Sequence, residues 1–298
     1  MAKTIHIPVL LQEAVLGLNL SSGDNVIDAT VGGGGHAKAI LEKTYPDGKL
    51  LGVDWDKMAI EMASEALKDF GNRAILKQGN YSDIKKIVYE SGFSEIRAVL
   101  LDLGASCDQF KDLSRGFSFE SDESLDMRFS DQVSTTAFDI VNTWPENDLA
   151  KIFTEYGEER HAARAAKNII TARRDAPILT AKDLAYTAMR GVGWRGRQRL
   201  HPATRVFQAL RIAVNSEFEN IQKGVPDMVD ILDRGGRMAV ITFHSLEDRI
   251  VKNIFKSMSK ADVPIVKLIN KKVIKPSREE VLSNRASRSA KLRIIEKL

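Results

Sequence analysis

Cysteine is nearly absent from this 298-residue sequence, which contains only Cys107. A single cysteine excludes a disulfide framework and indicates a reducing compartment. The five histidines show no metal-type spacing, so we expect no metal. No apolar run reaches the roughly 18 residues that a membrane-spanning helix needs, and the N-terminus has no signal-peptide pattern. We therefore expect a cytoplasmic protein that has no membrane partner.

Charge is abundant but unevenly distributed along the chain. The formal net charge is only +4, yet residues 151–211 hold 13 basic and 5 acidic residues, and residues 251–298 hold 13 and 4. The two segments carry +8 and +9, and the rest of the chain carries −13. Such segregation favours a polyanionic partner that contacts both basic segments, although solvated helix faces would give a similar pattern.

Short apolar runs alternate with helix-like segments over the first hundred residues. Four of these runs are typical of buried parallel strands, and they lie at 25–30, 48–56, 73–81 and 96–104. Such an alternation predicts an α/β fold with a doubly wound, mostly parallel sheet and right-handed crossovers.

Strand patterns are then missing from Cys107 to about residue 225, where the segments are helical. They return at 236–243, and a terminal strand pair is expected at 264–272 and 290–298. We therefore predict a ligand-binding sheet domain, residues 1–108 and 226–298, interrupted by a helical substrate-recognition domain, residues 109–225.

Four consecutive glycines follow the first predicted strand and precede the first helix. Each costs roughly 0.5–1 kcal/mol relative to alanine in regular structure, so a ligand lying against bare backbone is the expected reason. Backbone N–H groups and the helix dipole favour a negatively charged or carboxylate-bearing ligand there. Asp54 ends the next strand, where an acid accepts hydrogen bonds from ribose hydroxyls.

Two cofactors are compatible with this loop. Gly32-x-Gly34-x-x-Ala37 satisfies a dinucleotide fingerprint, which keeps an NAD(P)-linked oxidoreductase open as an alternative. Asp28, at the end of the first strand, would repel a pyrophosphate and attract the ammonium group of S-adenosylmethionine. The sequence therefore favours S-adenosylmethionine.

Three further side chains lie at predicted strand ends. Asp102 follows the fourth strand, Tyr81 follows the third and has a ring able to stack on adenine, and His244 follows the strand at 236–243. A loop acid, a buried tyrosine and a structural histidine are the competing interpretations. Ser245 and Asp248 have capping-box spacing, so we do not interpret this segment as a hydrolase triad.

A basic loop with one indole precedes a predicted helix in the insertion. Arginine forks bind phosphates and an indole stacks on a base, so these residues are candidate RNA contacts, and a solvated loop is the alternative. The candidates in and near this loop are Trp194, Arg195, Arg197, Arg199 and Arg205, and His244 is a further candidate RNA contact. A non-catalytic RNA-binding assembly factor is a further functional alternative.

Six segments occur in an order that resembles the bacterial 16S rRNA (cytosine-N4)-methyltransferase family, also called MraW. They are DATVGGGGHAKAIL, LLDLGASCDQF, RGFSFESDESLDMR, YGEERHAARAAKNI, HPATRVFQALRIAVNSE and FHSLEDRIVK. The resemblance implies a Rossmann-like class I methyltransferase sheet with an inserted all-helical domain. It also implies methyl transfer from S-adenosylmethionine to the N4 amine of a cytidine in the decoding region of the small ribosomal subunit, so 16S rRNA or the 30S particle is the expected partner.

The resemblance also assigns contacts with the methyl donor. These positions are Gly34, Gly35, His36, Asp54, Tyr81, Asp102 and Gln109. Tyr81 replaces a phenylalanine that is usual in the family, and Cys107 and Asp108 replace a serine and a proline before Gln109. Asp102 either accepts a hydrogen bond from the target amine, as the catalytic residue, or only binds the donor. The oligomeric state is open, and a homodimer is one expectation.

Overall fold

The computed structural model describes residues 8–104, 115–119, 121–192 and 201–298. The chain divides into two compact units, one formed by Met1–Gly104 with Phe218–Leu298 and the other by Ala105–Glu217. We call them the sheet unit and the helical unit. Among the described residues, no helix combines the length and the apolar character that crossing a bilayer requires.

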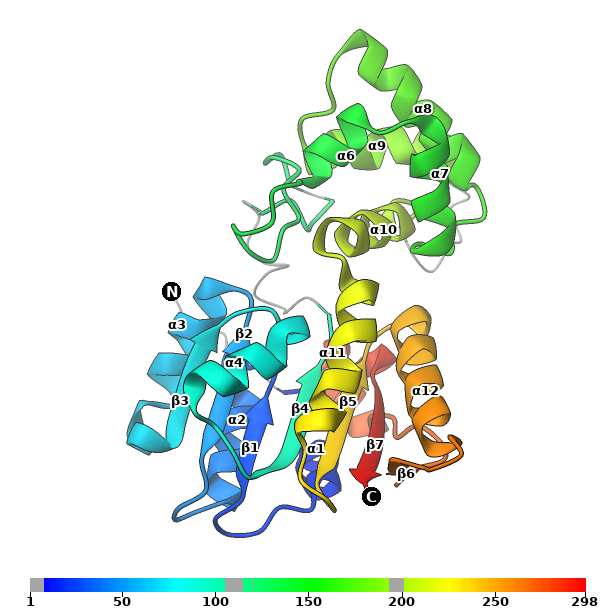
Figure 1. Cartoon of the computed structure of the whole chain (residues 1–298). Helices are drawn as coiled ribbons and strands as arrows, with labels where there is room; N and C mark the ends of the chain where they lie inside the picture. The colour runs from blue at the N-terminus through cyan, green and yellow to red at the C-terminus, as the bar shows by residue number, and fades with distance from the viewer. Residues whose placement is uncertain (1–7, 105–114, 120, 193–200) are drawn as a thin grey trace. The chain divides into compact units, whose positions relative to one another are not determined.

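A seven-stranded sheet lies at the centre of the sheet unit (Figure 1). Its strands are β1 (Asn25–Asp28), β2 (Leu50–Asp54), β3 (Ala74–Gln78), β4 (Ile96–Asp102), β5 (Arg237–Thr242), β6 (Val266–Leu268) and β7 (Lys291–Lys297). The order is β3-β2-β1-β4-β5-β7-β6; the first five strands are parallel, and β7 is antiparallel to both β5 and β6. The predicted doubly wound, mostly parallel sheet and its terminal strand pair are confirmed.

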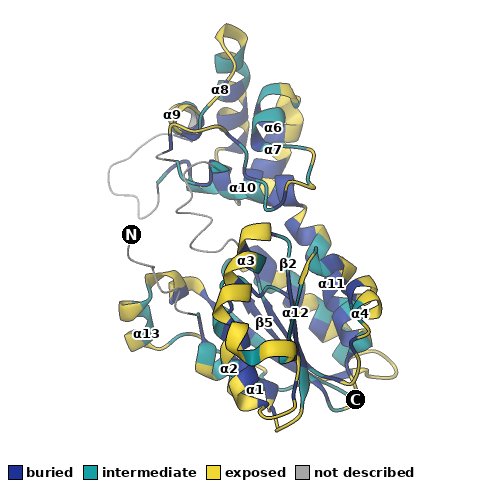
Figure 2. Ribbon diagram, turned by 90° about the vertical axis from the view of Figure 1, so that its left-hand side faces the viewer, coloured by how far each residue is buried: buried dark blue, intermediate teal, exposed yellow. Residues whose placement is uncertain are grey.

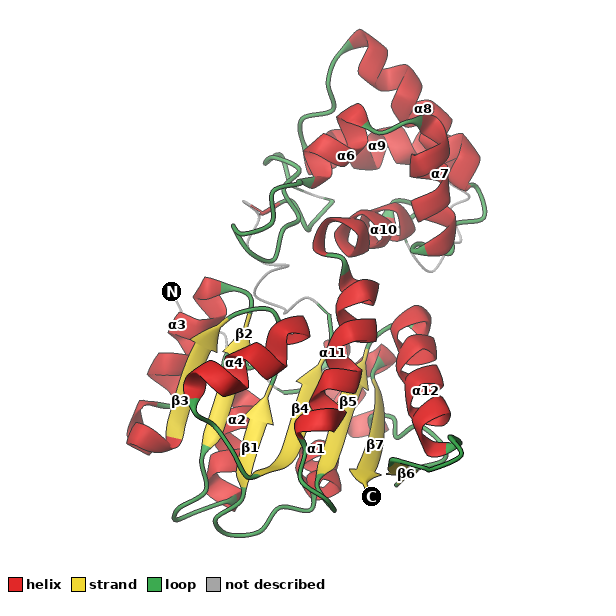
Figure 3. Ribbon diagram, viewed as in Figure 1, coloured by secondary structure: helices red, strands yellow, loops and turns green. Residues whose placement is uncertain are grey.

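Helices cover both faces of this sheet, as Figure 3 shows. The longer ones are α1 (Leu11–Leu18), α2 (Gly35–Lys43), α3 (Lys57–Ala66), α4 (Ile84–Ser91), α11 (Glu217–Ile231) and α12 (Ser245–Ser259), and α13 (Arg278–Ser283) is short. In Figure 1, α4 and α11 lie in front of the strands, whereas α1 and α2 lie behind and share a core with alternate residues of β1, β4 and β5. The two-residue period of a strand thus supplies apolar side chains to both layers.

The helical unit consists of α6 (Ala137–Thr143), α7 (Glu146–Glu155), α8 (Ala162–Asp175), α9 (Ala181–Val192) and α10 (Thr204–Asn215). These helices share an apolar core of their own, in which Phe153 and Leu210 are fully buried. Figure 2 shows buried residues along α6, α7 and α8. The Asp183 amide donates to Thr180 Oγ1 at 3.1 Å, and this hydrogen bond caps the start of α9.

The boundaries between the two units differ from the predicted ones, which lay at 108/109 and 225/226. The division falls at 104/105 and 217/218, so α11 from Phe218 onward belongs to the sheet unit. Lys85 of α4 forms ion pairs with Asp227 and Asp230 of α11, at 2.8 and 2.7 Å. These contacts join residues far apart in the sequence, and composition alone does not reveal them.

We expect Leu100→Ala in β4 to destabilise the sheet unit by about 2–5 kcal/mol, because it leaves a cavity in a fully buried layer. Urea denaturation followed by circular dichroism measures the change. The matched control is Leu16→Ala in α1, where the side chain is 73% exposed and the loss should be small. Equal losses for the two variants would contradict the assignment of Leu100 to the core.

Candidate functional site

Three aspartates end neighbouring strands where the direction of the sheet order reverses. The chain proceeds from β1 outward through β2 and β3, then returns to place β4 on the other side of β1. Asp28, Asp54 and Asp102 are the last residues of β1, β2 and β4. Open α/β sheets bind ligands in the crevice beyond the carboxyl ends of the strands at such a reversal.

The glycine loop joins β1 to α2, and the protein itself explains most of its glycines. Gly32 and Gly34 have φ values of +50° and +82°, which L-residues rarely adopt. At Gly35 a Cβ would collide with the ring of Pro8, so the chain preceding α1 needs a bare backbone there. A Cβ on Gly33 would meet only the Met62 side chain, at 3.7 Å. Ligand approach is therefore not needed to explain all four glycines, and Gly33 is the one that neither a positive φ nor a close contact explains.

Asp54 connects this loop to β2. Its Oδ2 accepts a hydrogen bond from the Gly32 amide and its Oδ1 accepts one from the Asp56 amide, both at 2.9 Å. Burial raises the pKa of Asp54 to about 6, although these amide hydrogen bonds act to lower it. The Trp55 amide also acts to lower this pKa. A carboxylate has about four lone-pair sites, so Asp54 can still accept a hydrogen bond from a hydroxyl group.

Asp28 is the most deeply buried of the three, with 1% of its surface exposed. Its Oδ1 accepts from the Thr30 amide at 3.3 Å, and its Oδ2 has no hydrogen-bond partner among the described residues. Burial raises the pKa of Asp28 to about 7; the Thr30 amide lowers it and the charge of Asp54 raises it further. This carboxyl group is therefore costly to ionise until a positive group or a hydrogen-bond donor approaches it.

Asp102 lies beside the predicted donor contact His36. His36 Nε2 is 3.0 Å from the Val9 carbonyl oxygen, and its Nδ1 is 3.8 Å from Asp102 Oδ2. A carbonyl only accepts, so Nε2 carries a proton. Asp102 Oδ1 is buried and has no hydrogen-bond partner within the described parts of the chain. Burial, followed by the charges of Asp28 and Glu247, raises the pKa of Asp102 well above its ordinary value.

Thr30 is a site residue that the sequence analysis missed. Its Oγ1 accepts a hydrogen bond from the Asp102 amide at 2.7 Å and so ties the end of β4 to the turn after β1. Asp28 is a binding candidate in its own right as well, because its Oδ2 has no hydrogen-bond partner among the described residues. A small hydroxyl residue two positions after a strand-ending acid is the local signal that was available.

Tyr81 opens the short 3-10 turn η2 (Tyr81–Asp83) that follows β3. Asn80 caps this turn by accepting from the Ser82 amide at 2.9 Å. A Cβ on Gly224 of α11 would lie 2.8 Å from the Tyr81 ring, so the ring packs against bare helix backbone. The structure thus orients this half-buried ring, and its stacking on adenine stays a prediction.

His244 is the N-cap of α12, and the predicted capping pair is wrong. The Glu247 amide donates to His244 Nδ1 at 3.4 Å, and Glu247 Oε2 accepts from the His244 amide at 3.2 Å. Asp248 pairs instead with Arg293, at 2.8 Å. The imidazole nitrogen takes the role expected of the Ser245 hydroxyl, one residue earlier. This arrangement supports a structural role for His244, and its contact with RNA stays a prediction.

Of the other residues predicted to contact the donor or the RNA, only Arg205 lies in a described part of the chain. Arg205 lies in α10 of the helical unit, with Nη1 4.0 Å from Glu159 Oε2. The others lie outside the described residues, and they are Gln109, Trp194, Arg195, Arg197 and Arg199. Their roles stay predictions from the sequence.

The model of the MraW methylase family matches residues 3–298 of this chain. The chain belongs to the MraW methylase family. Proteins named ribosomal RNA small subunit methyltransferase H are 44% identical in both Carboxydothermus hydrogenoformans and Syntrophotalea carbinolica, and each alignment covers 98% of both chains. Family membership confirms the resemblance, and it favours a methylase over an NAD(P)-linked oxidoreductase or a non-catalytic factor.

Solved structures are similar at much lower sequence identity. An rRNA methylase from Streptococcus thermophilus is 13% identical with a TM-score of 0.45, and the match covers 99% of each chain. A candidate methyltransferase from Streptococcus mutans, solved in complex with SAH, is 14% identical with a TM-score of 0.46 and covers 98% of this chain and 99% of its own.

We expect Asp28→Asn to stabilise the ligand-free protein relative to the wild type, and to do so more at pH 8 than at pH 5. The folded-state pKa of Asp28, about 7, lies above its ordinary value of 3.8. As pH rises from 3.8 to about 7, ionisation of Asp28 therefore lowers the stability of the wild type by about 1.4 kcal/mol per pH unit. The amide of Asp28→Asn does not titrate, so the variant does not lose this stability. Denaturation of both proteins from pH 4 to 8 measures the difference. Asp47→Asn, at an exposed position, controls for loss of one carboxylate, and parallel curves for wild type and Asp28→Asn would refute the assignment.

Proposed function

We propose that this protein transfers a methyl group from S-adenosylmethionine to the N4 amine of a cytidine in 16S rRNA. The observation that carries the proposal is the group of three strand-ending carboxylates in a methylase of the MraW family, two of which present a buried oxygen without a hydrogen-bond partner in the described structure. The names of the relatives supply the small-subunit rRNA as substrate.

The residues present fit S-adenosylmethionine. This molecule carries a sulfonium and an ammonium group together with ribose hydroxyls, and the unpaired oxygens of Asp28 and Asp102 are acceptors suited to such groups. Asp54 is the proposed ribose acceptor, and Gly34, Gly35 and His36, at the start of α2, are further proposed donor contacts. When bound, S-adenosylmethionine supplies an electrophilic methyl carbon, so the protein mainly has to align the reactants.

The target amine is a poor nucleophile because its lone pair is delocalised into the cytosine ring. A carboxylate that accepts one N–H hydrogen would favour a pyramidal nitrogen and take up the proton that the nitrogen releases. Asp102 has the chemistry for this role, with a buried acceptor oxygen at the end of β4. Its raised pKa means that it acts only after ionising, which a cationic ligand nearby would promote.

The helical unit is the proposed RNA-recognition domain, with Trp194, Arg195, Arg197, Arg199 and Arg205 as contacts. The target base has to leave its stack to reach a donor at the strand ends. Recognition of the assembled 30S particle, a homodimeric state and a cytoplasmic location belong to this proposal as predictions.

S-adenosylmethionine should bind more tightly as pH rises from 5.5 to 8. The pKa values of Asp54 and Asp28, about 6 and about 7, mean that protons occupy these carboxyl groups at the lower pH. A bound cation favours the ionised carboxylates, so binding releases protons. At pH values below the pKa of a group, that group should raise the affinity for S-adenosylmethionine by up to about tenfold per pH unit. Calorimetry in two buffers of different ionisation enthalpy measures the release. Affinity that is flat or falls with pH would contradict the model, and Asp28→Asn should flatten the profile.

We expect purified protein to form N4-methylcytidine in 16S rRNA or 30S particles supplied with labelled S-adenosylmethionine. Asp102→Asn should lower kcat by about 10²–10⁴, the usual range for a general base. Mass spectrometry of digested nucleosides measures the product, and calorimetry measures donor affinity. Lost turnover with donor affinity retained assigns Asp102 to the amine, whereas lost donor affinity assigns it to the donor. Wild-type protein that methylates no rRNA cytidine would refute the proposed function.

A further inference from the structure

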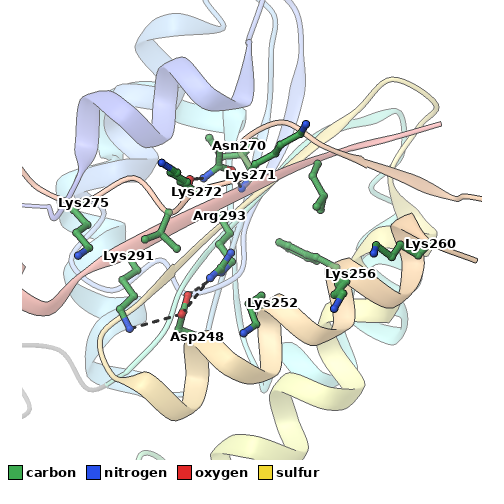
Figure 4. A pocket seen from close by; sticks show the side chains of 14 residues that line it. Asp248, Lys252, Lys256, Lys260, Asn270, Lys271, Lys272, Lys275, Lys291 and Arg293 are labelled. Atoms are coloured by element: carbon green, nitrogen blue, oxygen red, sulfur yellow. Dashed lines mark hydrogen bonds and ion pairs between the residues drawn. The ribbon is translucent and has the colours of Figure 1, made fainter.

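A second concave site lies in the sheet unit, among α12, the segment between β6 and β7, and β7 itself (Figure 4). Its cavity volume is about 690 Å³. The donor-site aspartates end β1, β2 and β4, whereas this pocket lies at the β7-β6 edge of the sheet. We call it the lysine pocket.

One wall of the lysine pocket is a face of α12. Lys252 and Lys256 are four residues apart, which aligns them along one side of α12, and Lys260 is the C-cap of the same helix. All three side chains are exposed. Phe255 and Ile294 also line the pocket, and we call these two buried side chains, at 2% and 3% exposure, its floor.

The opposite wall is the segment that leads from β6 toward β7. It contributes Lys271, Lys272 and Lys275, all exposed. Hydrogen bonds with β7 hold this segment in place. Asn270 Oδ1 accepts from the Ile294 amide at 2.7 Å, and Ile274 exchanges two backbone hydrogen bonds with Leu292 at 3.1 and 2.9 Å. The three ammonium groups therefore project from a backbone that is already ordered.

The positive charge of the pocket is not balanced by acids within it. Asp248 is the one acidic residue among the described residues that line it, and it is bound by Arg293 at 2.8 Å and by Lys291 at 3.7 Å. The dashed lines in Figure 4 mark these contacts. None of the six lysines on the two walls has an ion pair with a described acidic residue. A concave surface lined by one sign of charge concentrates the field and attracts counter-ions of the other sign.

We propose that the lysine pocket binds the phosphate backbone of the rRNA substrate, at a part of the RNA other than the target cytidine. The inference rests on the proposed function, because it assumes an RNA substrate. Lysine is a point charge that suits phosphate contacts, and such contacts set the position of a nucleic acid without reading its sequence. The aromatic side chain in the floor is buried, so it offers no platform for stacking a base. A membrane-binding surface would instead present fully exposed apolar groups beside its cations. Among the apolar side chains that line this pocket, Phe255 and Ile294 are buried and Leu268 and Val273 are half-buried, which favours RNA.

The test removes three positive charges from the pocket. The variant Lys256→Gln/Lys271→Gln/Lys272→Gln changes exposed side chains only, so its thermal stability and its affinity for S-adenosylmethionine should match the wild type. The matched control removes three charges elsewhere in the sheet unit, with Lys43→Gln/Lys68→Gln/Lys86→Gln.

Affinity for 16S rRNA is measured for all three proteins between 50 and 300 mM KCl. The pocket variant should lower the slope of log K against log[salt] by about 2–3, because each lost phosphate contact removes about 0.7–0.9. KM for rRNA should rise while kcat at saturating RNA stays near the wild-type value. The control triple should leave the slope within about one of the wild type.

The outcomes distinguish a failure of the lysine-pocket inference from a failure of the proposed function. If the wild type forms N4-methylcytidine but the pocket variant keeps the control's salt slope, the lysine-pocket inference is wrong and the proposed function stands. If the wild type neither binds nor methylates rRNA, both are wrong. A parallel arm uses phosphatidylglycerol vesicles and polyglutamate, and a loss of binding confined to either probe would replace RNA by a membrane or by an acidic protein as the occupant.

Discussion

The burial of carboxylates at adjacent strand ends is the constraint around which the sheet unit is organised. Parallel pairing aligns the ends of β1, β2 and β4, so Asp28, Asp54 and Asp102 meet at one edge. Removing such groups from water is unfavourable, and each remaining charge makes ionisation of the next more costly. The protein therefore holds these acids with pKa values above their ordinary range, and a cationic nucleoside is the kind of ligand that relieves this cost.

The local structure serves to hold these acids in place. Thr30 binds the Asp102 amide, the Gly32 amide binds Asp54, and both come from the turn after β1. One turn thus connects three strand ends through its backbone and one hydroxyl group. Positive φ at Gly32 and Gly34 is what allows the chain to make these contacts and still begin α2 immediately afterward.

Charges of opposite sign are separated within the same unit. The acids lie at the β1, β2 and β4 ends, and uncompensated lysines line the pocket beside α12 and β7. A methylase of rRNA has to bind a cationic donor and a polyanion at once, and this separation provides a region of suitable charge for each. In the two proposals taken together, the strand-ending acids bind the donor and the lysines bind the RNA backbone.

The sequence alone determined the strand and helix alternation, the glycine turn and the acids that end β1, β2 and β4. These features depend on local periodicity and on neighbours along the chain. Only the tertiary structure decided that Gly35 packs on Pro8, that His244 rather than Ser245 caps α12, and that α11 belongs to the sheet unit. It also decided that lysines from α12 and from the chain before β7 share one pocket. Each of these outcomes depends on contacts between residues distant in sequence or on competition between neighbouring side chains, and no local pattern encodes them.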